Sequence, residues 1–172
     1  MSEILIQTNG QDEIIGQVVR DEAHAQGLWH RRATVFVFNK NKELLIQKRA
    51  PNMSWPNTWS SSASGHVLDG ETYEDGARRE LKEEIGIECD FKLVGKIIEV
   101  TKSTEQDMID KEHHQLFVCS FDGPFQIQKE ELSEVKFESI ENIKKKISED
   151  PSQFTPGFIK EFEYYIKNIK IK

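Results

Sequence analysis

In the middle of the chain, apolar residues recur at every fourth position, and this spacing is typical of an amphipathic helix. The apolar positions are Ala77, Leu81 and Ile85. Thr72, followed three residues later by Asp75, matches a capping box and predicts where the helix begins. Gly86 is expected to end the helix in a left-handed conformation. The segment therefore predicts one helix with its apolar face turned toward a core.

Over shorter stretches on both sides of this helix, apolar and polar residues alternate as they do in strands. The predicted strands cover residues 13–19, 33–38, 43–48, 59–63, 91–101, 114–121 and 133–138. A hairpin turn over residues 39–42 is expected to make the second and third of these strands partners. Strands before and after one helix indicate a single α/β domain over residues 1–172, built as a sandwich around a mixed sheet.

Two further helices are predicted toward the end of the chain. One covers residues 140–147. The other is expected to begin at Thr155 as the N-cap, with Pro156 in the first helical position. Its apolar stripe consists of Phe158, Phe162, Tyr165, Ile166 and Ile169. These side chains are expected to fill the core rather than to bind a ligand.

Composition and charge narrow the classes of function. The net charge of -7 argues against nonspecific binding to a nucleic-acid backbone, which requires clustered Lys and Arg. An anionic substrate would then be held by a metal or by local cations. Cys89 and Cys119 predict reduced thiols without a disulfide framework. The first residues contain no basic region followed by a long apolar run, so no signal peptide or membrane span is predicted and the cytoplasm is the expected location.

Three carboxylates share one face of the predicted central helix. Glu80, Glu83 and Glu84 stand at i, i+3 and i+4, a spacing that places them side by side. Like charges this close repel one another, so an ordinary helix gains nothing from the arrangement. A hard divalent cation such as Mg²⁺ or Mn²⁺ turns that repulsion into binding. The alternative interpretation is an acidic face exposed to solvent, which is the usual meaning of a run of charge.

The segment over residues 65–87 resembles the Nudix box at each of its fixed positions. These positions are Gly65, Glu71, Arg79, Glu80, Leu81, Glu83, Glu84, Gly86 and Ile87. The resemblance implies an α/β/α sandwich and a divalent metal on the three glutamates, with the Gly65 carbonyl oxygen as a further ligand. It also implies Glu83 as the general base, and Glu112, in a predicted loop outside the box, is the alternative.

Arg79 is expected to be structural rather than catalytic. Its planar guanidinium suits a carboxylate such as Glu71 or Glu83 and would hold the acidic cluster in place. Glu71 and Arg79 are therefore interpreted as the structural pair of the box.

Outside the box, the chain is similar to type 1 isopentenyl-diphosphate isomerase and to bacterial hydrolases of the same branch. The similar segments include residues 27–34, 44–49 and 59–66. The isomerase requires a catalytic cysteine directly before its Gly-His pair, where this chain has Ser64. It also has a second glutamate where this chain has His114, and its box is degraded whereas this box is complete. Because an unassisted hydroxyl does not replace a thiol, these departures favour hydrolysis over isomerisation.

Several residues fall at or near the positions of the isomerase's first metal site. They are His30, His66, Glu112 and His114, and His24 is one residue away from a further position. Histidine and carboxylate ligands together suit transition metals, so the resemblance implies a candidate second metal site. The alternative is that these histidines face solvent or cap helices.

The residues that would hold the rest of the substrate are less defined. Lys48 and Arg49 would bind phosphate oxygens or would simply end a solvated strand. Trp29, Trp55 and Trp59 would stack on a base, cover an isoprenoid or pack in the core.

Together these features predict a Mg²⁺- or Mn²⁺-dependent hydrolase of a diphosphate linked to another moiety. The expected partner is a small-molecule diphosphate, not a nucleic-acid polymer or a membrane, and a homodimer is compatible with the sequence. Two alternatives stay open: an enzyme like isopentenyl-diphosphate isomerase, and a noncatalytic ligand-binding domain. The complete set of three glutamates argues against the binding domain, since such a module has no need of unscreened carboxylates.

Overall fold

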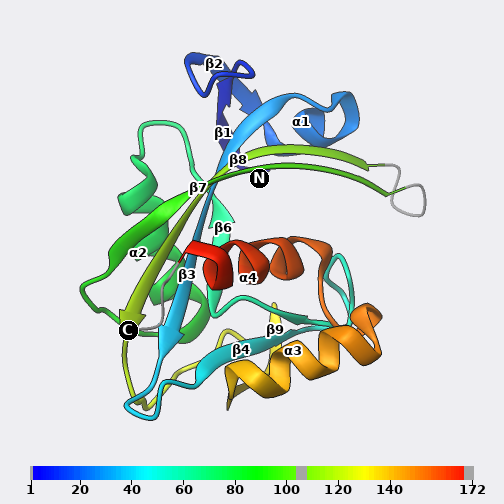
Figure 1. Cartoon of the computed structure of the whole chain (residues 1–172). Coiled ribbons are helices and arrows are strands. Elements are labelled where there is room, and N and C mark those ends of the chain that lie inside the picture. Colours follow the sequence, from blue (N-terminus) through cyan, green and yellow to red (C-terminus); the bar gives the residue numbers. More distant parts are fainter. Residues whose placement is uncertain (1, 104–107, 169–172) are drawn as a thin grey trace.

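The computed structural model describes residues 2–103 and 108–168, which form a mixed sheet with helices on both faces (Figure 1). The strands are β1 (Ile4–Thr8), β2 (Ile14–Val19), β3 (Trp29–Phe38), β4 (Leu44–Arg49), β5 (Trp59–Ser60), β6 (Ala63–His66), β7 (Lys92–Ser103), β8 (Met108–Ser120) and β9 (Leu132–Glu138). The helices are α1 (Arg20–Gln26), α2 (Tyr73–Ile85), α3 (Ile140–Glu149) and α4 (Pro156–Asn168), with the short 3₁₀ helix η1 (Pro151–Gln153).

β3 is the central strand and brings together segments that are far apart in the sequence. It runs parallel to β8 and antiparallel to β6, while β7 continues the sheet as the antiparallel partner of β8. His66 on β6 and His114 on β8 both pair with Arg32 of β3, from opposite sides. The sheet therefore places the residues before the box helix beside those of a strand about fifty positions later in the chain.

Alternation along β3 builds a core on each face of the sheet. Val35 and Val37 point toward α2 and belong to one buried cluster with Leu81. Phe36, between them, points the other way and packs with Phe158 of α4 in a second cluster. Because successive side chains of a strand point to opposite faces, one strand serves both layers. The predicted α/β/α sandwich around a mixed sheet is confirmed.

The predicted ends of the central and last helices are also confirmed. The Thr72 side chain accepts a hydrogen bond from the Asp75 amide, and the Asp75 carboxylate accepts one from the Thr72 amide. Gly86 follows α2 with φ of 70°, in the left-handed region that glycine tolerates best. Thr155 accepts a hydrogen bond from the Phe158 amide at the start of α4. Ile169, the last position of the predicted stripe, lies outside the described residues.

The sequence prediction misses two elements and misplaces the start of two strands. β1 has five residues, and α1 has seven and follows Val19, which makes no side-chain cap hydrogen bond. Short elements without caps leave little trace in a sequence. β3 begins at Trp29 and β8 at Met108, because both strands continue through charged and histidine residues that turn inward. Glu112 therefore lies on a strand, and the expected loop at this position is wrong.

One further predicted strand and one predicted pairing are corrected as well. The expected strand over residues 59–63 is two short strands, β5 and β6, separated by Ser61 and Ser62. The expected β3–β4 hairpin makes one pairing only, Phe38 with Leu44. The main partner of β4 is β9, which pairs with it along its length. The turn at residues 39–42 fixes where the chain reverses but not which strand pairs with β4. Leu44 and Ile46 of β4 pack with Ile143 of α3 in one buried cluster.

Candidate active site

A pocket of about 180 Å³ separates the acidic face of α2 from the inner face of β7 and β8. Glu80, Glu83 and Glu84 line one wall of this pocket. His24, His66 and Glu112 line the other wall. Gly65, at the end of β6, lies between the two groups. The fold thus places the box glutamates in one pocket with His66 and Glu112, two of the four residues expected at the second metal site.

Arg79 holds the carboxylates of the box segment in a fixed arrangement. Its Nε lies 2.7 Å from Glu71 Oε1, and its Nη1 lies 2.5 Å from Glu80 Oε1 and 3.2 Å from Glu83 Oε2. Its Nη2 donates to the backbone oxygen of His66 at 2.8 Å. Glu71 in turn accepts a hydrogen bond from the Leu68 amide, so the loop before α2 is tied to the helix. One guanidinium therefore positions the loop and the acidic face together.

Two of the three box glutamates are buried. The Glu84 carboxylate accepts hydrogen bonds from the Ser64 amide at 2.9 Å and from the Gln47 side chain at 3.3 Å. Burial raises the pKa of Glu84 to about 8, and the neighbouring Glu80 adds to the shift. Burial likewise raises the pKa of Glu80 to about 7, against the opposing effect of Arg79. Glu83 differs, because 55% of its side chain is exposed.

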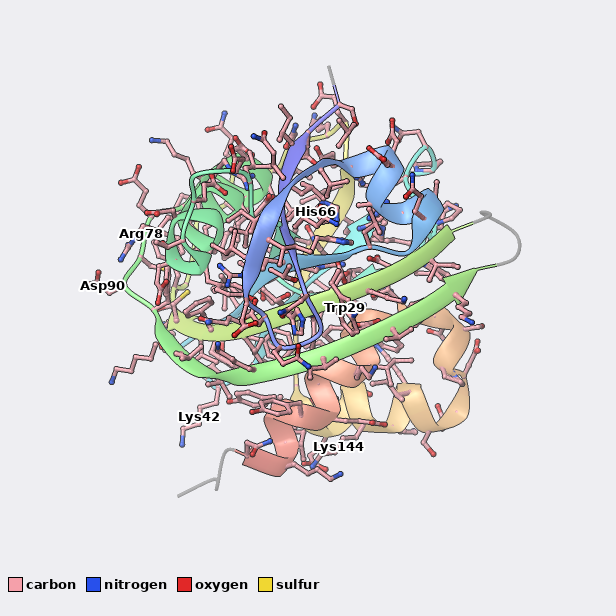
Figure 2. The ribbon with its side chains drawn as sticks, turned by 90° about the horizontal axis from the view of Figure 1, so that it is seen from above. Trp29, Lys42, His66, Arg78, Asp90 and Lys144 are labelled. Atoms are coloured by element: carbon pink, nitrogen blue, oxygen red, sulfur yellow. The ribbon has the colours of Figure 1, made fainter. Side chains whose placement is uncertain are left out.

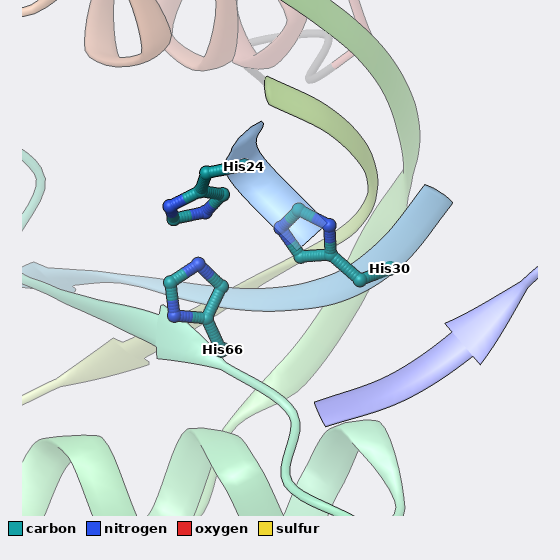
Figure 3. Close-up of side chains that lie close together, drawn as sticks. All are labelled: His24, His30 and His66. Atoms are coloured by element: carbon teal, nitrogen blue, oxygen red, sulfur yellow. The ribbon is translucent and has the colours of Figure 1, made fainter. Parts of the chain in front are cut away.

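Three histidines from different elements form a compact cluster in the opposite wall (Figure 3). His24 comes from α1, His30 from β3 and His66 from β6. Their ring centroids lie 5.1–5.2 Å apart, and one ring nitrogen from each lies within 4.8 Å of the others. Seen from above, His66 lies near the middle of the molecule (Figure 2). The three rings could hold one ion between them.

Glu112 lies between this cluster and His114. Its Oε1 is 3.6 Å from both His30 Nε2 and His66 Nε2, and its Oε2 is 2.7 Å from His114 Nε2. Burial favours the protonated form of Glu112, but Arg32, His114 and His30 outweigh it and hold the pKa of Glu112 well below its usual range. The structure thus brings the four residues expected at a second site together around one ionised carboxylate.

The two buried histidines of this cluster have opposite tendencies. Burial lowers the pKa of His66 to about 4. His30 is also buried, but hydrogen bonds to Asp110 and Glu112 outweigh the burial and raise its pKa to about 10. His66 is therefore neutral near pH 7 and has a free ring nitrogen, as a metal ligand requires.

Comparison with known proteins fits this geometry. A NUDIX domain model matches residues 28–158. The chain belongs to the Nudix family. Isopentenyl-diphosphate Delta-isomerase 2 of Photorhabdus laumondii is 32% identical over 161 residues, which cover 93% of this chain and 90% of that protein. A Nudix hydrolase of Listeria monocytogenes, described as uncharacterised, is 33% identical over 162 residues, covering 93% and 92%. The names of similar proteins are thus divided between isomerase and hydrolase.

Solved structures agree on the fold of this Nudix protein. DR0079 from Deinococcus radiodurans superposes with a TM-score of 0.67 and 24% identity, covering 86% of this chain and 90% of that one. At this identity the similarity supports the fold alone. No helix within the described residues is both long enough and apolar enough to cross a membrane.

The Nudix family implies a divalent metal ion, and the buried acidic face fits one. Glu80 and Glu84 are buried at 7% and 4% exposure, and Arg79 forms an ion pair with Glu80, whereas Glu84 is bonded to the neutral Ser64 amide and Gln47 side chain. Within the described residues, Gln47 Oε1 beside Glu84 has no hydrogen-bond donor. Buried carboxylates short of counter-charge are costly unless a cation joins them. The residues present therefore suit a hard divalent ion.

Sequence reasoning missed two arginines that line the pocket, Arg20 and Arg32. Arg32 on β3 donates to Ser64 Oγ at 2.8 Å, and its Nη1 lies 3.6 Å from Glu112 Oε2. Arg49, which was expected to bind phosphate, lines the same pocket. Arg32 stands two residues after His30 on one strand, so period-two alternation was the signal that could have placed both side chains on the inner face.

Of the other residues expected to contact the substrate, some line the pocket and some do not. Lys48 is not among the pocket-lining residues; its ammonium lies 5.7 Å from the centre of the Trp59 ring. Trp55 lines the pocket. Trp29 stacks instead on His113, with ring centroids 4.7 Å apart, on the opposite face of β3 and β8 from Glu112. Of the three tryptophans, Trp55 is the one placed to touch a bound molecule.

Gly65 is tightly packed against the acidic face. A Cβ at this position would lie 2.0 Å from Glu80 Oε1. We expect Gly65→Ala to push the Glu80 carboxylate aside and to weaken Mn²⁺ binding by about 10-fold, the scale seen when groups that orient metal ligands are lost. Isothermal titration measures this. Gly16→Ala is the control, since its Cβ would have no atom nearer than 3.8 Å; equal affinities in both variants would contradict the packing argument.

Proposed function

We propose that this Nudix protein is a divalent-metal-dependent hydrolase of a diphosphate linked to another moiety. One observation carries the proposal: Glu80, Glu83 and Glu84 line the pocket as a complete set, beside a hydroxyl at Ser64 where the isomerase requires a thiol. Carboxylates on one helix face prepare a site for a hard cation. A serine whose Oγ accepts a hydrogen bond from Arg32 is not an activated nucleophile.

The cation would be held by Glu80, Glu84 and Glu83 with the Gly65 carbonyl oxygen, and Mg²⁺ or Mn²⁺ suits these oxygen donors. When bound, such an ion lowers the pKa of water and neutralises charge on phosphoryl oxygens. Arg79 fixes the glutamates, and Gln47 and the Ser64 amide fix Glu84 from behind. The protein thus supplies the arrangement before the substrate arrives.

Glu83 is the proposed general base. Its side chain is more than half exposed at the pocket, and its ion pair with Arg79 is 3.2 Å long, so one oxygen is available to a water molecule. Glu112 suits this role less well. Its Oε2 is already bonded to His114, and the surrounding cations favour its ionised form so strongly that it accepts protons poorly.

The phosphate groups would be bound by Arg20, Arg32 and Arg49. All three line the pocket, and guanidinium forks match pairs of phosphate oxygens. Arg49 therefore keeps the phosphate-binding role that the sequence indicated, whereas Lys48 does not line the pocket and is not assigned that role. Trp55 and Met53, on the loop at the rim, would contact the group attached to the diphosphate.

A second candidate, isomerisation of isopentenyl diphosphate, is supported by the histidine cluster around Glu112 and by the names of several relatives. Two positions argue against it. Ser64 replaces the thiol, and His114 replaces the second glutamate. We expect no isomerase turnover with Mg²⁺, Mn²⁺ or Zn²⁺, measured as formation of the allylic diphosphate. Turnover near the ordinary enzymatic range of about 1 s⁻¹ or more would overturn the hydrolase proposal.

A screen for phosphate release tests the proposal directly. The panel contains nucleotide sugars, dinucleotides, nucleoside triphosphates, thiamine diphosphate and isopentenyl diphosphate, each with and without Mg²⁺ and Mn²⁺. We expect at least one compound to be hydrolysed, and we expect its hydrolysis to stop when a chelator removes the metal ion. Binding of these compounds without cleavage of any of them would favour the noncatalytic domain.

A further inference from the structure

On the far side of Glu112 from the three histidines lies a second group of buried potential ligands. Glu99 of β7 pairs with Glu112 of β8 across the sheet, and His114 stands two residues further along the same face. One ligand atom from each of the three lies within 4.8 Å of the others. His114 Nε2 is 2.7 Å from Glu112 Oε2 and 3.6 Å from Glu99 Oε2. These distances describe a small cradle, and Glu99 and Glu112 also line the pocket.

The carboxylates of this cradle are buried and incompletely bonded. Glu99 is 5% exposed and Glu112 is 1% exposed. Thr101 donates to Glu99 Oε1 at 2.7 Å, but within the described residues Glu99 Oε2 and Glu112 Oε1 have no hydrogen-bond donor. A buried carboxylate oxygen without a partner is costly. The free Oε2 of Glu99 faces His114 and Glu112, where a cation would satisfy it.

His114 is oriented to offer its Nε2 to this cradle. Its Nδ1 lies 3.2 Å from Glu161 Oε1 of α4. Thr34 donates to the same carboxylate at 2.7 Å, and Ser61 donates to its other oxygen. Both ring nitrogens face carboxylate oxygens, so without an ion each donates a hydrogen bond. With Nδ1 held by Glu161, Nε2 is the atom that would exchange its proton for a metal ion. A carboxylate behind a histidine is the usual support of a metal-bound imidazole.

The local charge also suits a cation. Glu99, Glu112 and Glu161 are all buried within reach of His114, whereas Arg32 is the nearest guanidinium, 3.6 Å from Glu112 Oε2. Without an ion, Arg32 and a protonated His114 face these three carboxylates. A divalent ion that displaces the proton on His114 Nε2 would give, with Arg32, three positive charges for three carboxylates.

We propose that Glu99, Glu112 and His114 bind a divalent transition-metal ion, with Glu161 as the residue that positions His114. Glu112 would then bridge two ions, its Oε2 in this cradle and its Oε1 facing His24, His30 and His66. Mixed imidazole and carboxylate donors suit Mn²⁺, Fe²⁺, Co²⁺ or Zn²⁺ better than Mg²⁺. The proposal does not rest on hydrolysis, because neither Glu99 nor Glu161 belongs to the box.

Metal content tests the two positions separately. The protein is loaded with Mn²⁺, desalted and analysed for bound metal per chain. Wild type is expected to hold one equivalent in each of the two positions beside Glu112, besides the ion on the box glutamates. Glu99→Gln is expected to lose one of the two, His24→Ala the other, and Glu112→Gln both. Glu163→Gln, at an exposed position of α4, is the matched control and keeps both. Full metal content in Glu99→Gln would overturn the proposal.

Anomalous diffraction from crystals grown with Mn²⁺ gives a test that needs no variant. Besides a peak at the box glutamates, two peaks are expected, one on each side of the Glu112 carboxylate, with the second in contact with Glu99 and His114. If the only peak near Glu112 lies among the histidines, with His114 Nε2 still bonded to Glu112, the cradle is refuted. Neither readout depends on turnover, so a failed substrate screen and a failed metal test are distinguishable.

Discussion

Glu83→Gln is expected to lower hydrolytic turnover by at least about 10²-fold, the usual contribution of a general base. The amide keeps the shape of the side chain but loses both its charge and its basicity. Because 55% of the Glu83 side chain is exposed, the fold should be intact. Removing one of three neighbouring carboxylates also reduces repulsion on the helix face. The measurement is steady-state turnover on a substrate identified by the phosphate-release screen, with circular dichroism to confirm folding.

Glu74→Gln is the matched control, since Glu74 is exposed in the first turn of the same helix and does not line the pocket. It should retain wild-type turnover. Glu71→Gln should weaken the loop before α2 more than the metal site, because Glu71 accepts hydrogen bonds from Leu68 and Arg79. Near-wild-type turnover in Glu83→Gln, or an unfolded protein, would remove Glu83 from the role of base.

The metal-free protein is expected to lose stability as the pH rises from 6.5 to 9. Burial raises the pKa of Glu84 to about 8 and that of Glu80 to about 7, from an ordinary value of 4.5. Between these values the folded state keeps protons that the unfolded chain has released, so a rise in pH favours unfolding. From pH 6.5 to 8, Glu84 alone lowers the free energy of unfolding by about 2 kcal/mol.

His30 acts in the same direction over this range. Despite its burial, Asp110 and Glu112 raise its pKa to about 10, and that stabilisation is lost as the pH rises toward this value. His66 is largely outside the comparison, because its lowered pKa of about 4 confines its titration to more acidic conditions. Above pH 6.5, the titration of the glutamates and that of His30 therefore both lower the free energy of unfolding as the pH rises.

Urea unfolding in the presence of a chelator, at pH 6.5 and at pH 9, measures the effect. Added Mg²⁺ should restore stability most at the higher pH, where the glutamates are ionised. Glu84→Gln should flatten the pH profile, because the amide does not titrate. Equal or greater stability at pH 9 without metal would contradict the burial of an acidic pair on α2.

Much of the fold could be predicted from local signals. Three sequence features predict α2: a four-residue apolar repeat, the Thr72 capping box and the terminal Gly86. All three are observed. These signals act within a few residues of the backbone that they shape. The partner of β4 is different, since its pairing with β9 depends on contacts between segments separated by almost ninety positions. No local pattern near β4 encodes that choice.

In the candidate site, too, the residues on one element could be predicted and those assembled from several elements could not. The three box glutamates could be located from helix spacing alone, because one helix carries them all. The opposite wall is assembled from α1, β3, β6, β7 and β8, so only the fold brings its side chains together. His24 illustrates the difference: it stands on a short helix without a sequence signal, yet its ring completes the cluster with His30 and His66. Glu99 and Glu161 could not be chosen at all, since isolated glutamates in a strand and a helix look like surface residues.

One measurement tests the central claim most directly. The best substrate from the screen is incubated with Mg²⁺ in water enriched in ¹⁸O, and the products are analysed by mass spectrometry. We predict that wild-type protein places one ¹⁸O atom in a phosphate product per cleavage, and that the labelled product is absent with chelator and reduced at least about 10²-fold in Glu83→Gln. Conversion of a diphosphate substrate to an isomer with its diphosphate intact and unlabelled, or labelling that is undiminished in Glu83→Gln, would contradict the account.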